Sequence, residues 1–319
     1  MTAQERNEAK DTAVWNEALT KIVLLDGGLG QELHKRSRLP AHPLWSLQVM
    51  RKRPELVQSV HEDFIRAGAR VLTLNTYTAT AARLARSGDL GWFEPLQEQA
   101  YDLAAAARQT TGCPFGPVQL AGCLPPLVGS FRSDLVPSDD ECFEQYRAIV
   151  ETQPKVDCFL CETMSSVREG RIAAEVALSA GKPVLLGFTV RDDGSAALRS
   201  GEPVEDMVAA VRELPLRGLL LNCSTPEAIR RALPPLVGSG LPFGAYANGF
   251  ESVDALEPGG TVDVLTARED LGPEEYATFA LEWLASGATL LGGCCEVGPS
   301  HIRHLHEELV ERGYSVTGL

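Results

Sequence analysis

The sequence lacks the features that mark several large classes of protein. No apolar run approaches the roughly 20 residues of a membrane-spanning helix, and the stretch from Met1 to Lys21 is too polar and too mixed in charge for a secretory signal. Basic residues are scarce, because 29 Lys and Arg stand against 43 Asp and Glu, for a formal net charge of −14. Nucleic acids and anionic membranes select for basic surfaces, so neither is expected as the main partner. We therefore expect a cytoplasmic protein in which residues 1–20 form a short helix or an arm.

The eight cysteines also lack the setting of a disulfide-rich secreted scaffold. A chain of 319 residues can bury a large core without disulfides. In the reducing cytosol, clustered thiols indicate metal binding or catalysis. Cys158 lies within an apolar run and is expected to be an ordinary core residue, since free cysteine is often simply buried.

What the sequence does have is a regular alternation of two kinds of segment. Its composition is that of an ordinary globular protein, with 44% hydrophobic and 23% charged residues. Eight short, continuous apolar runs are typical of parallel strands buried on both faces: Ile22–Leu25, Val71–Leu74, Val118–Ala121, Cys158–Leu160, Val184–Phe188, Gly218–Leu221, Phe243–Tyr246 and Thr289–Leu291. Segments with helical spacing follow them: Pro54–Ala67, Pro95–Arg108, Asp139–Thr152, Val167–Ala180, Val204–Leu214, Pro226–Leu233, Glu274–Ala285 and Pro299–Arg312. Eight such units over residues 21–319 predict an α/β protein with a single (β/α)8 TIM barrel.

Two further stretches bear on this interpretation. Asp26-Gly27-Gly28-Leu29-Gly30 follows the first run, but Leu33 occupies the third glycine position of a dinucleotide-binding GxGxxG motif, so an open doubly wound sheet is the weaker prediction. The stretch Glu251–Leu271 follows the seventh run and is interpreted as a long loop on the face where barrel active sites gather. Its length and its glycines suggest that it closes over substrate.

Three cysteines stand at the ends of predicted strands. Cys223 follows the sixth run, and Cys294 with Cys295 follows the eighth. Three thiolates around Zn²⁺ with one open position would make a catalytic rather than a closed structural site. Neighbouring side chains on a regular strand point to opposite faces, so Cys294 and Cys295 reach one ion only if Gly292 and Gly293 allow the backbone to turn. The residues alone also fit a buried cysteine pair with an unrelated third cysteine.

Several phrases together resemble one known family. They are Leu25-Asp26-Gly27-Gly28, Pro43-Leu44-Trp45-Ser46, Pro54-Glu55-Leu56-Val57, Asn75-Thr76-Tyr77, Cys161-Glu162-Thr163, Asn222-Cys223, Gly292-Gly293-Cys294-Cys295 and Pro299-Ser300-His301-Ile302. On these residues the sequence resembles the homocysteine S-methyltransferase family, which includes betaine–homocysteine methyltransferases and the homocysteine module of methionine synthase. The resemblance spans about residues 20–310.

The resemblance implies a TIM barrel that carries one Zn²⁺ per chain on Cys223, Cys294 and Cys295. It implies methyl transfer from a small sulfonium or ammonium donor, such as S-methylmethionine, S-adenosylmethionine or betaine, to the thiolate of L-homocysteine, giving methionine. The only catalytic group is then the substrate's own zinc-activated thiolate. Two other functions stay open: the homocysteine-activating subunit of a corrinoid-dependent methyltransferase, which needs a partner protein, and a non-catalytic zinc or metabolite sensor. The oligomeric state does not follow from the sequence.

Carried over residue by residue, the resemblance also implies a site for the amino-acid substrate. Asp26 and Glu162 match acids that hold the homocysteine ammonium group, and Gly27 and Gly28 match a turn whose backbone approaches the amino acid. Taken alone, Asp26 also fits a turn residue, since Asp is favoured there by local hydrogen bonds. Glu162 also fits an ion-pair partner at a helix start.

A cationic methyl donor favours aromatic faces. Trp45 and Tyr77, together with Thr76 of the same phrase as Tyr77, are therefore expected at the substrate site, although each ring fits a packing role nearly as well. His301 is expected to cap or pack the last helix, because three thiolates and the substrate already fill a tetrahedral site. Leu74 stands where the family often has Thr, which predicts the loss of one polar contact in the pocket.

Overall fold

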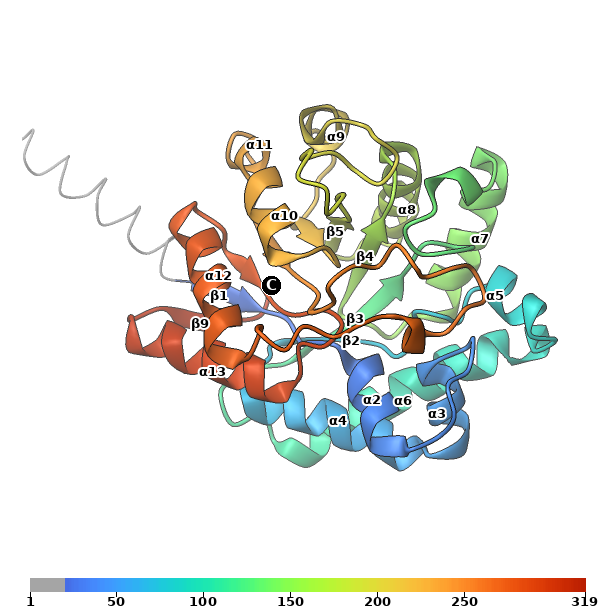
Figure 1. The fold of residues 1–319 in the computed structure, drawn as a ribbon. Coiled ribbons are helices and arrows are strands. Elements are labelled where there is room, and N and C mark those ends of the chain that lie inside the picture. Colours follow the sequence, from blue (N-terminus) through green and yellow to red (C-terminus); the bar gives the residue numbers. More distant parts are fainter. Residues whose placement is uncertain (1–20) are drawn as a thin grey trace, which may run out of the picture.

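The computed structural model describes residues 21–319, so the expected helix or arm over residues 1–20 lies outside the described residues. Its sheet contains nine parallel strands in the order β2-β3-β4-β5-β6-β7-β8-β1-β9 (Figure 1). The sheet curls round on itself, because Leu25 after β1 forms a parallel bridge with Val71 of β2. The Arg70 N–H also donates to the Leu24 carbonyl over 2.7 Å. The result is the predicted (β/α)8 TIM barrel.

Every predicted apolar run is a strand of this sheet. The strands are β1 (Lys21–Leu24), β2 (Val71–Thr73), β3 (Gln119–Leu124), β4 (Cys158–Met164), β5 (Val184–Phe188), β6 (Gly218–Asn222), β7 (Phe243–Tyr246), β8 (Leu290–Leu291) and β9 (Ser315–Thr317). The sequence analysis missed β9, because this strand is only three residues long and incompletely buried, so it carries no apolar run. It pairs with β1 from Lys21 to Val23.

The predicted helical segments are also helices, with bounds that agree within three residues. They are α4 (Pro54–Ala67), α6 (Phe93–Thr111), α7 (Asp139–Thr152), α8 (Val167–Ser179), α9 (Val204–Val211), α10 (Pro226–Ala232), α12 (Pro273–Ala285) and α13 (Pro299–Glu311). Helix α7 begins where predicted because Ser138 and Glu141 form a capping box, in which the Ser138 N–H donates to the Glu141 carboxylate over 3.0 Å.

Several short elements were not predicted. They are α2 (Leu29–Ser37), α3 (Ser46–Lys52), α5 (Ala81–Arg86), α11 (Pro234–Val237) and the single 3₁₀ turns η1 (Leu90–Trp92), η2 (Ser133–Leu135) and η3 (Val262–Val264). Helix α2 begins inside a glycine-rich phrase that is typical of a turn, which hides it in the sequence. Helices α2, α3 and α5 lie in the connections that follow β1 and β2, and each contributes residues to the main pocket.

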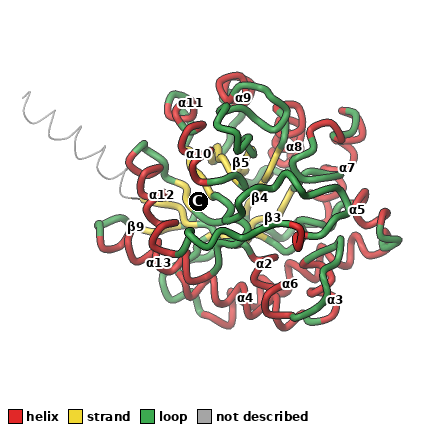
Figure 2. Tube along the Cα trace, viewed as in Figure 1, coloured by secondary structure: helices red, strands yellow, loops and turns green. Residues whose placement is uncertain are grey.

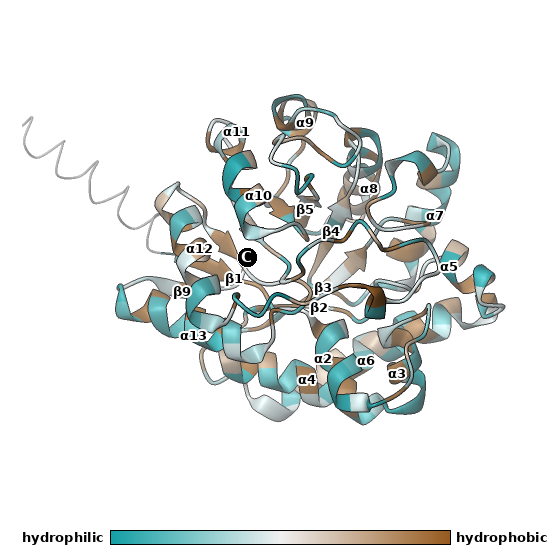
Figure 3. Cartoon of the chain, in the orientation of Figure 1, coloured by the Kyte–Doolittle hydropathy of each residue, from teal (hydrophilic) through white to brown (hydrophobic). Residues whose placement is uncertain are grey.

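The core has two layers. Figure 2 shows the strands enclosed by helices, and Figure 3 shows apolar residues along the strands with polar residues on the outer helices. The larger layer lies between sheet and helices. The smaller layer fills the barrel interior with Leu25, directly after β1, and with buried residues from every strand from β2 to β8: Val71, Ala121, Cys158, Leu160, Leu185, Leu220, Tyr246 and Leu290. Cys158 is therefore the core residue that was expected. Within residues 21–319, no helix combines the length and apolarity needed to cross a membrane.

The long loop between β7 and α12 lies where the sequence analysis expected it. An isolated bridge joins Phe250 to Ala267, and η3 is its one helical turn among the described residues. Phe250, Val253 and Leu265 face the pocket at the carboxyl ends of the strands. The loop therefore forms one wall of that pocket.

We expect Gly244→Ala to destabilise the barrel. A Cβ at Gly244 would lie 1.7 Å from the Leu290 carbonyl oxygen, so β7 and β8 would have to move apart, at a cost of about 1–3 kcal/mol or more. Gly238→Ala is the matched control, because a Cβ there meets no atom within 4 Å and its φ of −87° suits alanine. The measurement is the urea midpoint of each variant, and equal midpoints would contradict the packing argument.

Candidate metal and substrate site

Three thiols meet at the carboxyl end of the barrel. The Sγ atoms of Cys223, Cys294 and Cys295 all lie within 4.8 Å of one another. Cys223 follows β6 directly, and the other two follow the short strand β8. All three line one pocket, with a cavity volume of about 140 Å³. The three cysteines singled out from the sequence are thus neighbours in space, and this group is a candidate metal site.

The backbone turns immediately after β8, as two adjacent cysteines in one cluster require. The Gly293 N–H donates to the Asp26 carbonyl over 2.9 Å, and the Cys294 N–H donates to the Ala247 carbonyl over 2.9 Å. The Tyr276 hydroxyl donates to the Gly292 carbonyl over 2.5 Å. These bonds tie the ends of β1, β7 and β8 together around the cluster.

Glycine serves this turn through close packing rather than through unusual dihedral angles. Gly292 and Gly293 have no positive φ; the left-handed residue of the turn is Glu296, with φ 66°. A Cβ at Gly293 would lie 2.2 Å from Val297, and a Cβ at Gly28 would lie 2.5 Å from the Cys294 carbonyl oxygen. The turn therefore needs these glycines for their small size, and it does not need backbone angles that only glycine adopts.

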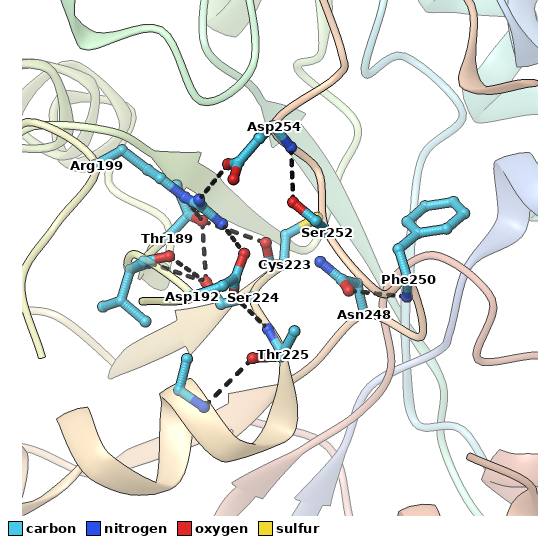
Figure 4. Close-up of polar contacts among 12 residues, drawn as sticks. Thr189, Asp192, Arg199, Cys223, Ser224, Thr225, Asn248, Phe250, Ser252 and Asp254 are labelled. Atoms are coloured by element: carbon cyan, nitrogen blue, oxygen red, sulfur yellow. Dashed lines mark hydrogen bonds and ion pairs between the residues drawn. The ribbon is translucent and has the colours of Figure 1, made fainter. Parts of the chain in front are cut away.

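Cys223 adopts a strained backbone that a polar cluster stabilises. Its φ is 49°, in the left-handed region that non-glycine residues rarely adopt. Figure 4 shows its carbonyl beside Thr189, whose hydroxyl donates to it over 3.2 Å. Arg199 lies next to Thr189 and pairs with Asp192 at 2.6 Å. Asp192 also accepts the Thr225 N–H over 2.9 Å, so the cluster holds the chain on both sides of Cys223.

A second connection joins Cys223 to the strand that carries Glu162. The Thr163 N–H donates to the Asn222 Oδ1, the Asn222 Nδ2 donates to the Thr163 hydroxyl, and each distance is 2.9 Å. Gly187 of the intervening strand β5 makes room for this pair, since a Cβ there would lie 2.8 Å from the Asn222 Oδ1. The pair fixes the spacing between a thiol and a carboxylate.

The two predicted acids line the same pocket, and each accepts hydrogen bonds from buried donors. Asp26 accepts the Thr73 N–H over 2.9 Å and the Thr73 hydroxyl over 3.1 Å. Glu162 accepts the Cys123 thiol over 3.1 Å and the Tyr246 hydroxyl over 3.2 Å. The hydroxyl that contacts Asp26 thus belongs to Thr73, one residue before the Leu74 that departs from the family pattern.

Both carboxyl groups are buried without a cation beside them among the described residues. Burial, with a smaller contribution from the neighbouring Glu162, raises the pKa of Asp26 to about 8. Burial also raises the pKa of Glu162 to about 7, with a contribution from Cys223. A primary ammonium group placed between them would lower both pKa values, because an opposite charge favours the ionised carboxylate.

The thiols affect one another's ionisation. The pKa of Cys295 falls to about 5, because hydrogen bonds with the thiols of Cys223 and Cys294 favour its thiolate. The pKa of Cys294 is raised by its hydrogen bonds with the other two and by burial. A cluster that already favours one thiolate suits a cation that binds sulfur.

The remaining predicted substrate residues divide into two groups. Gly27, Gly28, Trp45 and Tyr77 line the pocket, whereas Thr76 is buried outside its lining, because its N–H turns back to the Leu74 carbonyl over 2.7 Å. The Gly28 N–H donates to the Val297 carbonyl over 2.9 Å, so it is not free to bind an amino acid.

The two aromatic rings pack against protein groups as well as facing the pocket. The rings of Trp45 and Tyr77 meet edge to face with centroids 6.5 Å apart. The Trp45 Nε1 donates to Gln31 over 3.1 Å, and the Tyr77 hydroxyl lies 2.8 Å from the Ser130 hydroxyl. The packing role and the pocket role that the sequence left open are therefore compatible.

Some residues around the pocket have a strained backbone or hydrogen-bond to the two acids, and the sequence analysis missed them. Among residues 21–319, four of the eight non-glycine residues with positive φ line this pocket: Trp45, Phe131, Thr163 and Cys223. Thr73, Cys123 and Tyr246 hold the acids, but nothing in a single sequence marks a hydroxyl or thiol that contacts a residue from another strand. His301 caps α13 as expected, since its Nδ1 accepts the Gly298 N–H over 3.2 Å.

Comparison with known proteins identifies the family of the chain. The family model described as homocysteine S-methyltransferase matches residues 23–309. Homocysteine S-methyltransferase of Escherichia coli (strain K12) is 31% identical over 304 residues, covering 89% of this chain and 94% of that protein. The selenocysteine Se-methyltransferase of Brassica oleracea var. italica is 24% identical over 318 residues, covering 91% of this chain and 89% of that protein. The crystal structure of the metallated E. coli homocysteine methyltransferase MmuM superposes with a TM-score of 0.76 at 30% identity, covering 90% of this chain and 96% of that chain.

The fold and the site together define a TIM-barrel methyltransferase, in which a thiol cluster and two buried acids share one pocket. More specifically, the chain belongs to the homocysteine S-methyltransferase family. The family predicted from the sequence motifs is thereby confirmed.

We expect the stability of the unliganded protein to fall as pH rises from about 5 to about 8, and Asp26→Asn to reduce this fall. The folded protein keeps the Asp26 proton up to about pH 8, whereas the ordinary pKa is 3.8. The unfolded chain therefore binds fewer protons in this interval, and the group removes up to about 1.4 kcal/mol of stability per pH unit. Urea unfolding of both proteins at the two ends of the interval measures this, and identical pH dependence would contradict the raised pKa.

Proposed function

We propose that this protein transfers a methyl group from a small sulfonium or ammonium donor to the sulfur of L-homocysteine, giving methionine, with one Zn²⁺ held by Cys223, Cys294 and Cys295. The donors in view are S-methylmethionine, S-adenosylmethionine, betaine and similar compounds. The observation that carries the proposal is a cluster of three sulfur atoms within 4.8 Å, open to a pocket that also contains Asp26 and Glu162.

The thiol cluster fits Zn²⁺ in ligand type and in size. Zn–S bonds of about 2.3 Å in a tetrahedron place two sulfur ligands about 3.8 Å apart, and the observed cluster lies within 4.8 Å without an ion. When bound, Zn²⁺ on three thiolates would hold an acceptor thiol as its thiolate at neutral pH and leave that sulfur nucleophilic. Three protein ligands leave the fourth tetrahedral position for that acceptor.

In this proposal the two acids bind the ammonium group of the acceptor. Homocysteine brings one positive charge, and neither Asp26 nor Glu162 has a cation beside it in the part of the chain that the structure describes. Thr73 orients the first acid, and Cys123 and Tyr246 orient the second. An amino acid held at its ammonium end would direct its thiol toward the cysteines, and such positioning is worth several kcal/mol in a two-substrate reaction.

The rest of the pocket suits a cationic donor. Trp45, Tyr77, Phe131 and Phe250 line it, and aromatic faces attract onium groups. As the new sulfur–methyl bond forms, the bond from the methyl carbon to the donor sulfur or nitrogen breaks, and the electron pair of that bond neutralises the donor. Since the acceptor has already lost its proton, no side chain needs to act as a general base.

We expect Cys294→Ser to lose most of its zinc, with an affinity that falls by more than the 10–100-fold typical of losing an outer hydrogen bond at a metal site. The measurement is metal content after dialysis against a chelator of known affinity. Cys113→Ser is the matched control, because Cys113 is a half-buried free cysteine outside the cluster. Equal zinc in both variants would show that the ligand assignment is wrong.

We expect the zinc-loaded protein alone to form methionine from homocysteine and at least one small onium donor. Each donor is supplied separately, and methionine is measured by mass spectrometry. Asp26→Asn should raise the KM for homocysteine about tenfold or more, because a charge-assisted hydrogen bond is lost. Bound zinc and homocysteine without turnover from any donor would instead favour the partner-dependent methyltransferase or the sensor.

A further inference from the structure

Trp45 reaches the main pocket from a strained stretch of chain. It immediately precedes α3, its N–H donates to the His42 carbonyl over 2.7 Å, and its φ of 47° lies in the left-handed region. Its partly buried ring lines the pocket. A Cβ at Gly30 would lie 2.5 Å from this ring, so the ring packs directly on the backbone of α2. Because another side of the ring faces the cavity, its direction depends on the contacts of its one polar atom, Nε1, as well as on packing.

One buried amide contacts that atom. The Trp45 Nε1 donates to the Gln31 Oε1 over 3.1 Å, and the Gln31 Nε2 donates to the Glu296 Oε1 over 2.5 Å. An indole N–H can only donate and a carboxylate can only accept, so the amide between them has a single orientation. Gln31 is only 5% exposed, and a buried amide that lost either partner would keep an unsatisfied polar atom. The three side chains thus form one directed chain of hydrogen bonds.

The far end of this chain of hydrogen bonds belongs to the turn that carries the cysteine pair. Glu296 directly follows Cys295 and is the left-handed residue of that turn, with φ 66°. Its second oxygen, Oε2, accepts the Lys35 ammonium group over 2.7 Å. Gln31 and Lys35 stand four residues apart on α2, so both donors reach Glu296 from one face of the helix. The turn after β8 is thereby connected through α2 to the aromatic wall of the pocket.

We propose that Gln31 and Glu296 are positioning residues, which hold the Trp45 ring in the direction that lets its face bind the methylated onium group of the donor. This inference rests on the proposed function, because it concerns the donor half of the same site. Neither Gln31 nor Glu296 lines the main pocket, so both act through Trp45 rather than on a substrate. A cation is attracted by the face of an aromatic ring, whereas the edge is positive. A ring that turned about its side-chain bonds would therefore present the wrong surface to the donor.

The first test measures the contact of the ring without any ligand. In the proton–nitrogen NMR spectrum of the zinc-loaded full chain, the resonance that disappears in Trp45→Phe is the indole N–H of Trp45. Gln31→Met keeps the length of the side chain and removes both hydrogen bonds, so it should shift this resonance and speed its exchange with solvent. Glu296→Gln should leave the resonance near its wild-type position, because glutamine still offers Gln31 an acceptor oxygen. An unshifted resonance in Gln31→Met would overturn the proposal.

The second test measures the binding of trimethylsulfonium, an onium that carries only methyl groups, in the absence of homocysteine. Calorimetric titration should give a Kd about 3- to 10-fold higher for Gln31→Met than for the wild-type protein, with a similar rise for Glu296→Leu. Glu296→Gln should keep most of the wild-type affinity. Equal Kd values for the wild-type protein, Gln31→Met and Glu296→Leu, or no binding of the probe by the wild-type protein, would contradict the assignment.

The matched control is Arg36→Met on the same helix, since Arg36 forms its ion pairs with Glu32 and Asp63 instead. It should keep the wild-type Kd; an equal rise in this variant would mean that α2 only needs to be stable, which also overturns the proposal. With active enzyme, Gln31→Met should raise the KM for the donor and leave the KM for homocysteine unchanged. Because both tests are made without turnover, a protein that binds the probe but forms no methionine would contradict the proposed function alone.

Discussion

The contact on which the whole site depends is the close approach of the chain after β1 to the chain after β8. Two hydrogen bonds of 2.9 Å cross this contact, from the Gly28 N–H to the Val297 carbonyl and from the Gly293 N–H to the Asp26 carbonyl. A Cβ at Gly27 would lie 2.1 Å from the Val297 carbonyl oxygen. Glycine on both sides therefore sets the distance between an acid of the substrate site and the paired cysteines, and a larger residue would separate the two functions.

The pocket also contains two buried acids that have no cation beside them among residues 21–319. Asp26 and Glu162 are buried with hydroxyl, thiol and backbone donors only, and burial raises their pKa values. Unpaired buried charges reduce folding stability, so such groups are concentrated where a ligand supplies the missing partner. Strained backbone is concentrated there too, at Cys223 and Thr163.

Most of the framework was predictable because it depends on patterns that are local in sequence. Buried parallel strands read as continuous apolar runs, and capping residues such as Ser138 mark helix starts, so the barrel follows. The three cysteines were predictable because Cys223 directly follows one such strand, and Cys294 and Cys295 follow another after two glycines. The residues that hydrogen-bond to the acids were not predictable. Thr73 and Tyr246 look like ordinary strand residues in the sequence, and only the closed barrel brings them to Asp26 and Glu162. The opposite case is Thr76, which belongs to a family motif but does not line the pocket.

The sequence by itself determined the (β/α)8 architecture, the family and the three thiols, because repeated local periodicity and short motifs specify these without reference to distant contacts. Only the tertiary structure decided which side chains surround those thiols. Barrel closure places β1 between β8 and β2, so the Asp26 carbonyl accepts the Gly293 N–H although the two residues stand near opposite ends of the described chain. Ionisation and ligand charge depend on such neighbours, which no single stretch of sequence contains.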